Sequence, residues 1–430
     1  MNILILGSGG REHAFAWKIK QSPLCDKLYI LPGNAGTAKI AQNINIPVDN
    51  FEEIGKFCLS HQIELVLVGP EVPLVLGVVD YFEGHPSLKG IPVIGPNKLA
   101  STLEGSKDFS KKFMRKYNIP TASYRTFTKE NYQEGIKYLE SHSLPIVLKA
   151  DGLAAGKGVI ISANRDEAIR DFSEMIQDSK FGEASSKVVV EQFLKGIELS
   201  VFVLTDGKNY KILPEAKDYK RIGEEDTGPN TGGMGAVSPV SFATDIFLSK
   251  VENQIIIPTI EGLKQEGIKY KGFIFFGLIN VEGEPYVIEY NCRMGDPETE
   301  VVIPRIKTDF VELLQAVGKE DLDKKTIEFD ERSAATVMLV AGGYPGDYEK
   351  GKEIKGLDSI ESAMVFHAGT KINDQHKVVS NGGRVLTVTA YGESLADALH
   401  NSYKQVNKIS WEGRYFRSDI GKDLLSLKYN

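Results

Sequence analysis

The chain has 430 residues, 42% hydrophobic and 25% charged, a composition typical of a soluble globular protein of roughly two to four domains, and no apolar stretch approaches membrane-spanning length. Lysine and arginine number 51 against 58 acidic residues, and the net charge of −7 without a long basic run excludes nucleic acid as an expected partner. The cysteines Cys25, Cys58 and Cys292 lie far apart, which predicts neither a disulfide framework nor a zinc site and fits a reducing cytoplasm.

The first hundred residues alternate short apolar strands with helices. Strands are expected at 3–6, 27–31, 64–68 and 91–94, and helices at 11–18, 50–61 and 72–82. This alternation predicts a parallel, doubly wound sheet, in which ligands bind beyond the carboxyl ends of the strands. The loops 7–10, 32–37 and 69–71 follow such ends and are candidates for one pocket.

The first of these loops is the glycine-rich turn Gly7-Ser8-Gly9-Gly10, followed by Arg11. A dinucleotide fingerprint needs a third glycine where this chain has Glu12, so a dehydrogenase is disfavoured. Two interpretations remain: a single phosphate held by backbone N–H groups with Arg11, or an ordinary tight turn.

From about residue 105 the pattern changes to shorter strands and hairpins. A helix is expected at 106–118, strands at 145–149, 159–161, 188–191, 198–204 and 272–279, and a further helix at 309–317. The polar stretch 318–331 is interpreted as a linker to a strand-rich unit that ends in helices. The sequence therefore predicts a second α+β domain and a third, C-terminal α+β domain.

A second glycine-rich element runs from Gly152 to Gly158 and carries Lys157, with Lys149 at the end of the preceding strand. It is not a Walker A loop, because it joins two strands and lacks the hydroxyl residue that binds magnesium. A glycine hairpin with two lysines suits nucleotide phosphates, although a mobile surface hairpin has the same composition.

Two later segments are also ambiguous. Between the strands at 188–191 and 198–204, the backbone of 192–194 is free to bind an adenine edge and Glu198 to accept from ribose hydroxyls, or the break is a routine connection. The glycine-dense stretch 227–236 follows the basic segment 217–221 and is interpreted as an anion-binding lid, with a plain surface loop as the alternative.

The segment with the most candidate functional side chains lies at the end of a strand near residue 290. Glu289, Asn291 and Arg293 stand at alternate positions, so they are expected to share one face and converge on one ligand. Two oxygen donors suit Mg²⁺ and an adjacent arginine suits a phosphoryl group in transfer. The alternative is the wet face of an edge strand.

The order of these elements resembles the ATP-grasp superfamily, and more closely the glycinamide ribonucleotide synthetase (phosphoribosylamine–glycine ligase) family. The resemblance spans all three expected domains. It is carried by ten motifs in order: GSGGREHA at 7–14, PGNAGT at 32–37, VGPE at 68–71, LEGSKDF at 103–109, KADGLAAGKGV at 149–159, DTGPNTGGMGA at 226–236, NCRMGDPE at 291–298, AGGYPG at 341–346, FHAGT at 366–370 and NGGRVL at 381–386.

The resemblance implies a three-domain organisation. It places an N-terminal α/β domain for phosphoribosylamine at 1–108, a central ATP-grasp domain at 109–318 and a C-terminal α+β domain at 329–430. The implied reaction joins glycine to 5-phosphoribosylamine through glycyl phosphate, giving glycinamide ribonucleotide, ADP and phosphate in de novo purine (IMP) biosynthesis. The partners implied are these small molecules, with no nucleic acid and no membrane, for a cytoplasmic monomer or weak homo-oligomer.

The resemblance also implies a role for each motif residue. Catalytic roles fall to Arg293 and Asp218, and Mg²⁺ (or Mn²⁺) binding to Glu289 and Asn291. The other implied contacts are with ATP, the co-substrate, at Lys107, Lys149, Gly156, Lys157, Glu191, Phe193, Leu194 and Glu198, and with phosphoribosylamine at Gly9, Gly10, Arg11 and Glu71. Glu191, Phe193 and Leu194 belong to the adenine and Glu198 to the ribose. Asp218 or Asp296 is the expected partner of the glycine ammonium.

Two departures from the family pattern stand out. Lys217 and Tyr219 occupy positions where the family often has Gln and His. The strand at 272–279 offers no second metal-facing carboxylate. Two other interpretations stay open at this point: an ATP-grasp ligase for a different amine or carboxylate, and a catalytically silent nucleotide-binding protein that keeps the fold.

Overall fold

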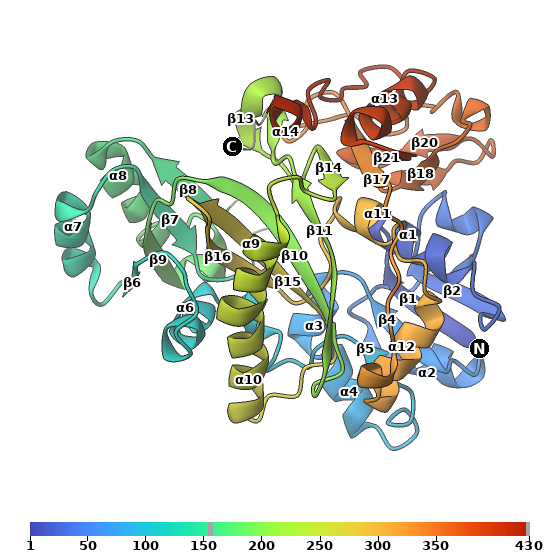
Figure 1. Cartoon of the computed structure of the whole chain (residues 1–430), viewed down its shortest axis with the longest axis horizontal. Helices are drawn as coiled ribbons and strands as arrows, with labels where there is room; N and C mark the ends of the chain where they lie inside the picture. The colour runs from blue at the N-terminus through green and yellow to red at the C-terminus, as the bar shows by residue number, and fades with distance from the viewer. Residues whose placement is uncertain (154–157, 427–430) are drawn as a thin grey trace.

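The N-terminal domain is a five-stranded parallel sheet with the strand order β3-β2-β1-β4-β5. The structure is a computed structural model that describes residues 1–153 and 158–426 (Figure 1). The strands are β1 (Asn2–Gly7), β2 (Lys27–Pro32), β3 (Gln42–Asn43), β4 (Leu65–Val68) and β5 (Val93–Ile94). The helices between them are α1 (Gly10–Ile19), η1 (Thr37–Lys39), α2 (Phe51–Ser60), α3 (Glu71–Leu76) and α4 (Val78–Gly84). The predicted parallel sheet is confirmed.

The single helix expected at 72–82 is two helices instead. Gly77 separates α3 from α4 with a φ of +96°, a left-handed conformation that glycine adopts without steric cost. The earlier start of α3 places Glu71 in its first turn, directly beyond β4.

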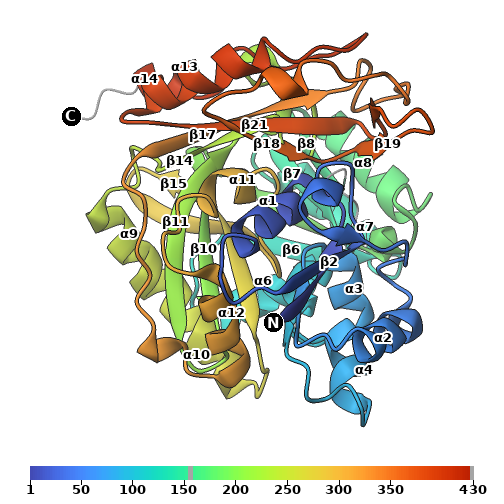
Figure 2. The same ribbon diagram turned by 90° about the vertical axis from the view of Figure 1, so that its right-hand side faces the viewer.

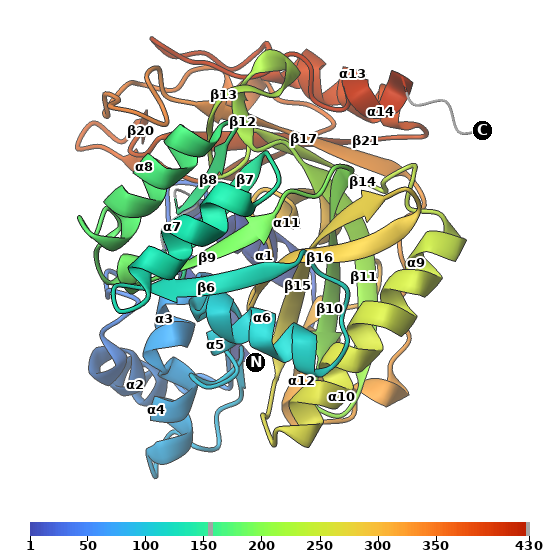
Figure 3. The ribbon, with the colours of Figure 1, turned by 90° about the vertical axis from the view of Figure 1, so that its left-hand side faces the viewer.

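The central region begins with a small sheet and two helices that cover one of its faces (Figure 3). Its strand order is β6-β9-β7-β8, antiparallel throughout. The elements are α5 (Thr102–Gly105), α6 (Lys107–Lys116), β6 (Tyr124–Thr128), α7 (Tyr132–Ser141), β7 (Ile146–Ala150), β8 (Val159–Ser162), α8 (Arg165–Ile176), η2 (Gly182–Ser186) and β9 (Lys187–Gln192). Helix α6 contacts β9, helix α7 contacts β6, and helix α8 contacts β7, β8 and β9.

A second, eight-stranded sheet continues from the central region into the C-terminal region. Its order is β16-β15-β10-β11-β14-β17-β21-β18 (Figure 2). The strands are β10 (Ile197–Thr205), β11 (Tyr210–Asp218), β14 (Gly235–Ser238), β15 (Gly272–Val281), β16 (Glu284–Asn291), β17 (Ser333–Val340), β18 (Met364–His367) and β21 (Arg384–Gly392). The antiparallel β14–β17 pairing joins the two regions into one sheet.

The remaining elements are helices and two small hairpins. They are β12 (Arg221–Gly223), η3 (Glu224–Asp226), β13 (Thr227–Asn230), α9 (Asp245–Val251), a π-helical turn η4 (Glu252–Ile256), α10 (Ile257–Gln265), α11 (Thr299–Val302), α12 (Phe310–Lys319), η5 (Leu322–Lys324), η6 (Leu357–Ser359), β19 (Thr370–Ile372), β20 (Val378–Ser380), α13 (Leu395–Val406) and α14 (Lys422–Ser426). The segment interpreted as a loop at 227–236 thus contains β13 and the start of β14. No helix within 1–153 and 158–426 is long and apolar enough to cross a membrane.

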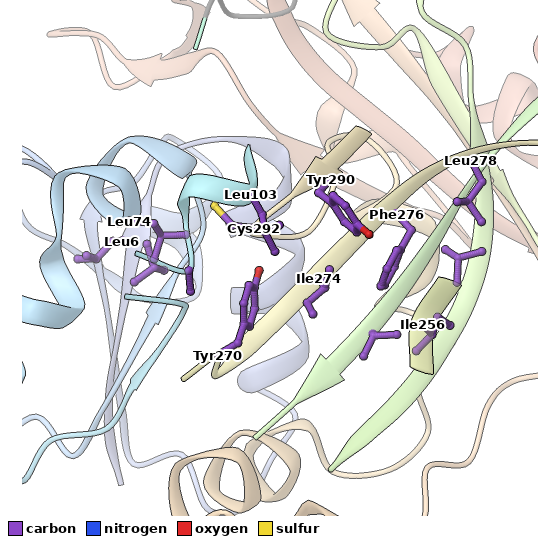
Figure 4. Close-up of a cluster of buried hydrophobic side chains, with 14 of the residues drawn as sticks. Leu6, Leu74, Leu103, Ile256, Tyr270, Ile274, Phe276, Leu278, Tyr290 and Cys292 are labelled. Atoms are coloured by element: carbon purple, nitrogen blue, oxygen red, sulfur yellow. The ribbon is translucent and has the colours of Figure 1, made fainter. Parts of the chain in front are cut away.

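One apolar core connects the N-terminal domain to the large sheet. Leu6 and Leu74 of the first domain belong to the same buried cluster as Ile274, Phe276 and Tyr290 (Figure 4). Burying such side chains contributes about 1.5–3 kcal/mol each. The core therefore fixes the end of β16 against the loops of the parallel sheet.

Candidate active site

The end of β16 presents Glu289 and Asn291 next to a glycine of the neighbouring strand. Gly277 of β15 pairs with Glu289, and a Cβ at Gly277 would lie 3.1 Å from the Glu289 Cγ. Position 277 thus leaves room for the Glu289 side chain. A register shift at Ile288 interrupts strict alternation, and Arg293 lies beyond the last strand residue.

The charge of Glu289 is set by the cations around it. Burial by itself raises the pKa of this carboxyl, but the fields of Lys220, Lys149, Lys107 and Arg293 outweigh burial and hold the pKa below its ordinary value. Glu289 is therefore ionised at neutral pH, and the cations around it include Lys107 and Lys149, which the sequence assigned to phosphates.

Arg293 bridges two carboxylates from the N-terminal side of the site. Its Nε lies 3.4 Å from Glu71 Oε2 and its Nη2 2.8 Å from Glu104 Oε1. Burial lowers the pKa of Arg293, but Glu104 and Glu71 outweigh that effect and raise it, so the guanidinium keeps its charge. Glu104 also accepts from the Cys292 backbone N–H at 2.8 Å and from its thiol at 3.0 Å. These contacts fix the chain just beyond β16.

Lys149 joins the small sheet to β16. Its Nζ donates to the Ile288 carbonyl at 3.1 Å and lies 3.0 Å from Glu191 Oε2. The same Glu191 oxygen is 3.1 Å from Lys111 Nζ, and all three side chains are almost fully buried. Burial lowers the pKa of Lys111 to about 8. Lys149 therefore lies at the floor of the site, beside the carbonyl that precedes Glu289.

Lys107 stands at the start of α6 and points to the glycine hairpin. Its Nζ donates to the Gly152 carbonyl at 3.3 Å, and the Asp151 carboxylate accepts from the Asp108 backbone N–H at 2.7 Å. Burial lowers the pKa of Lys107, and nearby Glu289 opposes that effect. Gly156 and Lys157, both assigned to ATP, lie outside the described residues, so their roles stay predictions.

The break between β9 and β10 holds the residues assigned to the adenine and ribose. Phe193 is exposed and Leu194 half-buried, directly after Gln192 ends β9. Glu198 of β10 is 3.1 Å from Lys220 Nζ, and Lys220 lowers the pKa of that carboxyl. The adenine and ribose assignments stay predictions, and Glu191, whose carboxylate is 3.0 Å from Lys149 Nζ, lies near the end of β9 just before this break.

The glycines of the N-terminal loops make room for one buried carboxylate, that of Glu12. A Cβ at Gly7 would lie 2.4 Å from the Glu12 Cγ, and a Cβ at Gly69 would lie 2.0 Å from Glu12 Oε1. The other carboxylate oxygen accepts from the Gly9 backbone N–H at 2.5 Å. Glu12 fills the space where a dinucleotide fold keeps a glycine, which accounts for the failed fingerprint.

Arg11 and Asp296 meet at the start of α1. Arg11 Nε is 2.6 Å from Glu12 Oε1 and its Nη1 donates to the Met294 carbonyl at 3.1 Å. Asp296 Oδ2 is 3.4 Å from the Arg11 backbone nitrogen, and its Oδ1 is 3.0 Å from Arg384 Nη2. The Arg11 side chain, which is assigned to phosphoribosylamine, thus already binds the chain that leaves β16.

Arg384 brings the C-terminal region into the site. Its Nη1 donates to the Gly232 carbonyl at 2.6 Å and to the Asp296 carbonyl at 2.8 Å. The glycine-rich segment interpreted as a lid is therefore held to the β16 exit by a residue of β21. Arg384 lies within one of the sequence motifs, but the motif did not indicate a role for it. Glu104, Lys111 and Lys220 were likewise not identified from the sequence.

Two acidic side chains after Asp296 are buried. Glu298 accepts from the Ser200 hydroxyl at 3.1 Å, and burial together with Asp218 raises its pKa to about 7. Glu300 has no hydrogen-bond partner on either carboxylate oxygen within the described part of the chain. Burial and Asp296 raise the pKa of Glu300 well above its ordinary value.

Replacing Glu298 by glutamine is expected to change how stability depends on pH. Because the folded pKa lies above the unfolded value, ionising Glu298 destabilises the folded protein as pH rises, and glutamine removes that loss. Relative to the parent, E298Q should gain about 2–3 kcal/mol of unfolding free energy between pH 5 and pH 8. Urea unfolding at pH 5 and at pH 8 measures this difference. The control is E261Q, at an exposed position on α10. Equal changes of unfolding free energy with pH in E298Q and the parent would contradict the prediction.

The side chains at the end of β16 fit a hard divalent cation. A carboxylate held ionised and an amide oxygen are the donors that Mg²⁺ takes from proteins, with the remaining positions filled by water and phosphate. Among the residues that the structure describes, no group of three His, Cys, Asp or Glu side chains is arranged to hold a metal alone. Glu289 and Asn291 thus suit a metal that arrives with a nucleotide.

Comparisons with known proteins place the chain in one family. The N domain of phosphoribosylglycinamide synthetase matches residues 1–104, its ATP-grasp (A) domain 105–299 and its C domain 334–423. Phosphoribosylamine–glycine ligases of Yersinia pestis and Escherichia coli K12 are 48% and 46% identical, each over 98% of both chains.

Solved structures agree with the sequence comparisons. The crystal structure of phosphoribosylamine–glycine ligase from Thermotoga maritima has a TM-score of 0.84 at 36% identity, covering 97% of this chain and 100% of that one. The biotin carboxylase domain of Hydrogenobacter thermophilus 2-oxoglutarate carboxylase shares the fold, with a TM-score of 0.71 at 17% identity over 100% and 99% of the two chains. The chain therefore belongs to the phosphoribosylglycinamide synthetase family, whose central domain is of the ATP-grasp type.

Proposed function

We propose that this protein joins glycine to 5-phosphoribosylamine at the expense of ATP, giving glycinamide ribonucleotide, ADP and phosphate. The observation that carries this proposal is the family match across all three domains. The convergence of Lys107, Lys149 and Arg293 on the Glu289 carboxylate supports it, because a cation-lined pocket at an ionised carboxylate suits a metal-bound triphosphate.

The first step transfers the γ-phosphoryl group of ATP to the carboxylate of glycine. The glycine oxygen attacks phosphorus, ADP leaves, and glycyl phosphate forms. Arg293, whose raised pKa keeps it charged, balances the negative charge that spreads over the transferring oxygens. Glu289 and Asn291 would hold Mg²⁺ or Mn²⁺, which supplies further charge neutralisation when bound.

The second step is attack of the phosphoribosylamine nitrogen on the glycyl carbonyl carbon, which expels phosphate. The N-terminal loops are the proposed binding site for this amine substrate, through the backbone at Gly9 and Gly10, Arg11 and Glu71. The first backbone N–H groups of α1 have no helical partner, and in this structure the carboxylates of Glu12 and Asp296 accept from those of Gly9 and Arg11, which marks this helix start as a place for acceptor oxygens. Because glycyl phosphate hydrolyses readily, the hairpin at 152–158 is proposed to exclude water.

The ammonium group of glycine needs an anionic partner, and Asp218 suits this role better than Asp296. Asp296 is already paired with Arg384 at 3.0 Å, whereas the Asp218 carboxylate forms no ion pair within residues 1–153 and 158–426, although the charge of Lys220 acts on it. Burial raises the pKa of Asp218, and an ammonium group would restore its charged form. The charge of Asp218 in turn raises the pKa of Glu298, so the two carboxyl groups lie close enough to interact.

Replacing Asp218 by asparagine is expected to raise the KM for glycine at least about tenfold, with the KM for ATP nearly unchanged. The change removes one charge at nearly constant volume. Steady-state kinetics with each substrate varied in turn measures the effect, and D374N in an exposed loop is the matched control. An unchanged glycine KM in D218N would assign the ammonium to another residue.

The reaction itself is tested by omitting each substrate from an assay of ADP formation. We expect ADP only when ATP, glycine, phosphoribosylamine and Mg²⁺ are all present, and glycinamide ribonucleotide as the product. ADP formation that is independent of phosphoribosylamine, or a different amine or carboxylate accepted in preference, would indicate another ATP-grasp ligase. No turnover with all four would indicate a nucleotide-binding protein without catalysis.

We further propose that the protein acts in the cytoplasm, in purine synthesis, as a monomer or weak homo-oligomer. All three cysteines are free thiols, which suits a reducing compartment. Light scattering of the purified protein over a range of concentrations measures the oligomeric state.

A further inference from the structure

A basic groove lies between α6 and the edge strand β6, and none of its lining residues is among those assigned to the substrates. Its cavity volume is about 630 Å³. The lining residues are Asp108, Lys112, Arg115, Lys116, Tyr124, Arg125, Thr126, Thr128 and Lys187. Five of the nine are cationic and one is acidic, in a chain whose net charge is −7. We call these nine residues the α6–β6 groove.

Helix α6 separates this groove from the candidate active site. Lys107 and Lys111 are four residues apart, so they share the helix face that contacts Gly152 and Glu191. Asp108 and Lys112 are likewise four residues apart on the adjoining face, where Asp108 accepts from the Thr126 hydroxyl at 2.8 Å. The groove is therefore a separate space with its own set of cations.

The single acid of the groove lies at its floor and is already satisfied. Asp108 is only 4% exposed, and its Oδ2 is 2.8 Å from Lys112 and 3.5 Å from Lys187. Although burial raises the pKa of Asp108, its hydrogen bonds from Lys112 and Thr126 hold the pKa below its ordinary value. Its one negative charge is shared by two lysines, which leaves the groove electropositive.

The other three cations of the groove, Arg115, Lys116 and Arg125, have at most weak ion-pair partners. Lys116 pairs with Glu266, and Arg125 lies 3.2 Å from Glu134, but these side chains are largely solvent-exposed. Exposed ion pairs contribute only about 0–1 kcal/mol, so a multiply charged ligand can displace them. Arg115 makes no ion pair with a described acidic residue.

We propose that the α6–β6 groove is a second anion site, which binds a phosphorylated small molecule of about nucleotide size. Arg115 and Lys116 on α6 and Arg125 on β6 line the groove together with the Tyr124 hydroxyl, and guanidinium, ammonium and hydroxyl groups all donate to phosphate oxygens. The volume lies within the range of small-molecule sites. A nucleic acid fits less well, because the cations form one compact group on an acidic protein.

The proposal is tested by calorimetric titration of the full chain with inorganic triphosphate while a saturating non-hydrolysable ATP analogue with Mg²⁺ occupies the active site. The test variant combines R115Q, K116Q and R125Q, which leaves the Asp108 contacts intact. The control combines K371Q and K404Q, the same kind of neutralisation at exposed positions on β19 and α13. We expect the parent and the control to bind triphosphate alike, and the test variant to bind it at least tenfold more weakly.

Several results would overturn the proposal. One is that the parent, with the ATP analogue bound, does not bind triphosphate. Another is that the parent and the test variant bind triphosphate equally. The third is that a single-stranded oligonucleotide binds the groove more tightly than triphosphate does. Binding of the ATP analogue, measured in a separate titration of each protein, should be unchanged in all variants, which separates a groove effect from loss of the folded active site.

Discussion

Replacing Arg293 by lysine is expected to lower kcat by roughly 10³-fold, with the KM for ATP changing by much less. The guanidinium reaches Glu71 and Glu104 together, through Nε at 3.4 Å and Nη2 at 2.8 Å. A single ammonium keeps the charge but cannot hold both carboxylates and still face a phosphoryl group. Single-turnover measurement of ADP formation separates this chemical step from product release.

The control for Arg293 is Glu104→Gln, which keeps the guanidinium and removes the charge of one of its two partners. If Arg293 acts on the transferring phosphoryl group, E104Q should lose much less activity than R293K, since the amide still accepts from the arginine. Equal losses in the two variants would mean that Arg293 serves only to fix the chain beyond β16, through the contacts of Glu104 with Cys292.

Replacing Glu289 by glutamine is expected to lower kcat at saturating ATP by roughly 10²–10³-fold and to raise the Mg²⁺ concentration required for half-maximal rate. The substitution removes the charge that four cations hold ionised and keeps the shape that Gly277 accommodates. Titration of the rate with Mg²⁺ and with Mn²⁺ measures both effects and the metal preference.

Glu284→Gln, at the exposed start of the same strand, is the matched control for Glu289. It should leave the metal requirement unchanged. If E289Q also leaves that requirement unchanged, the carboxylate is an electrostatic partner of the lysines and the metal is held elsewhere. If E289Q requires more Mg²⁺ but regains the parent's kcat at high Mg²⁺, Glu289 serves only to bind the metal.

The local features of the fold were predictable from the sequence. Short apolar strands alternating with helices gave the parallel sheet, because that pattern depends on residues close together in the chain. The one helix at 72–82 was wrong, since a glycine inside an apolar run permits but does not force a break, and only the φ of +96° at Gly77 shows it.

The long-range features were not predictable in the same way. The β14–β17 pairing joins segments about one hundred residues apart in sequence, and no local pattern specifies which strands become neighbours. The same reason applies to the site. Glu289 and Arg293 could be picked out from one strand, but Glu104 reaches Arg293 across 189 residues, and Arg384 reaches Asp296 across 88.

The two departures from the family pattern have a shared structural partner. Lys217 lies 3.1 Å from the Asp423 carboxylate, and the Tyr219 hydroxyl donates to the other Asp423 oxygen at 2.6 Å. The Lys217 ammonium also stands 3.8 Å from the centre of the Tyr219 ring. The residues on either side of Asp218 therefore hold α14 in place, which ties the last helix to the strand that carries the proposed glycine contact.

The eight-stranded sheet has a consequence for how the protein can be divided. The family's C domain begins at residue 334, inside β17. One edge of β17 pairs with β21 of the same domain, and the opposite edge pairs with β14 of the central region. A fragment cut at that boundary would expose the backbone N–H and C=O groups along one side of β17, a template for strand-to-strand association between molecules. The C-terminal region is thus a structural part of the central ATP-grasp region, and a truncated version of this protein should be cut elsewhere or not at all.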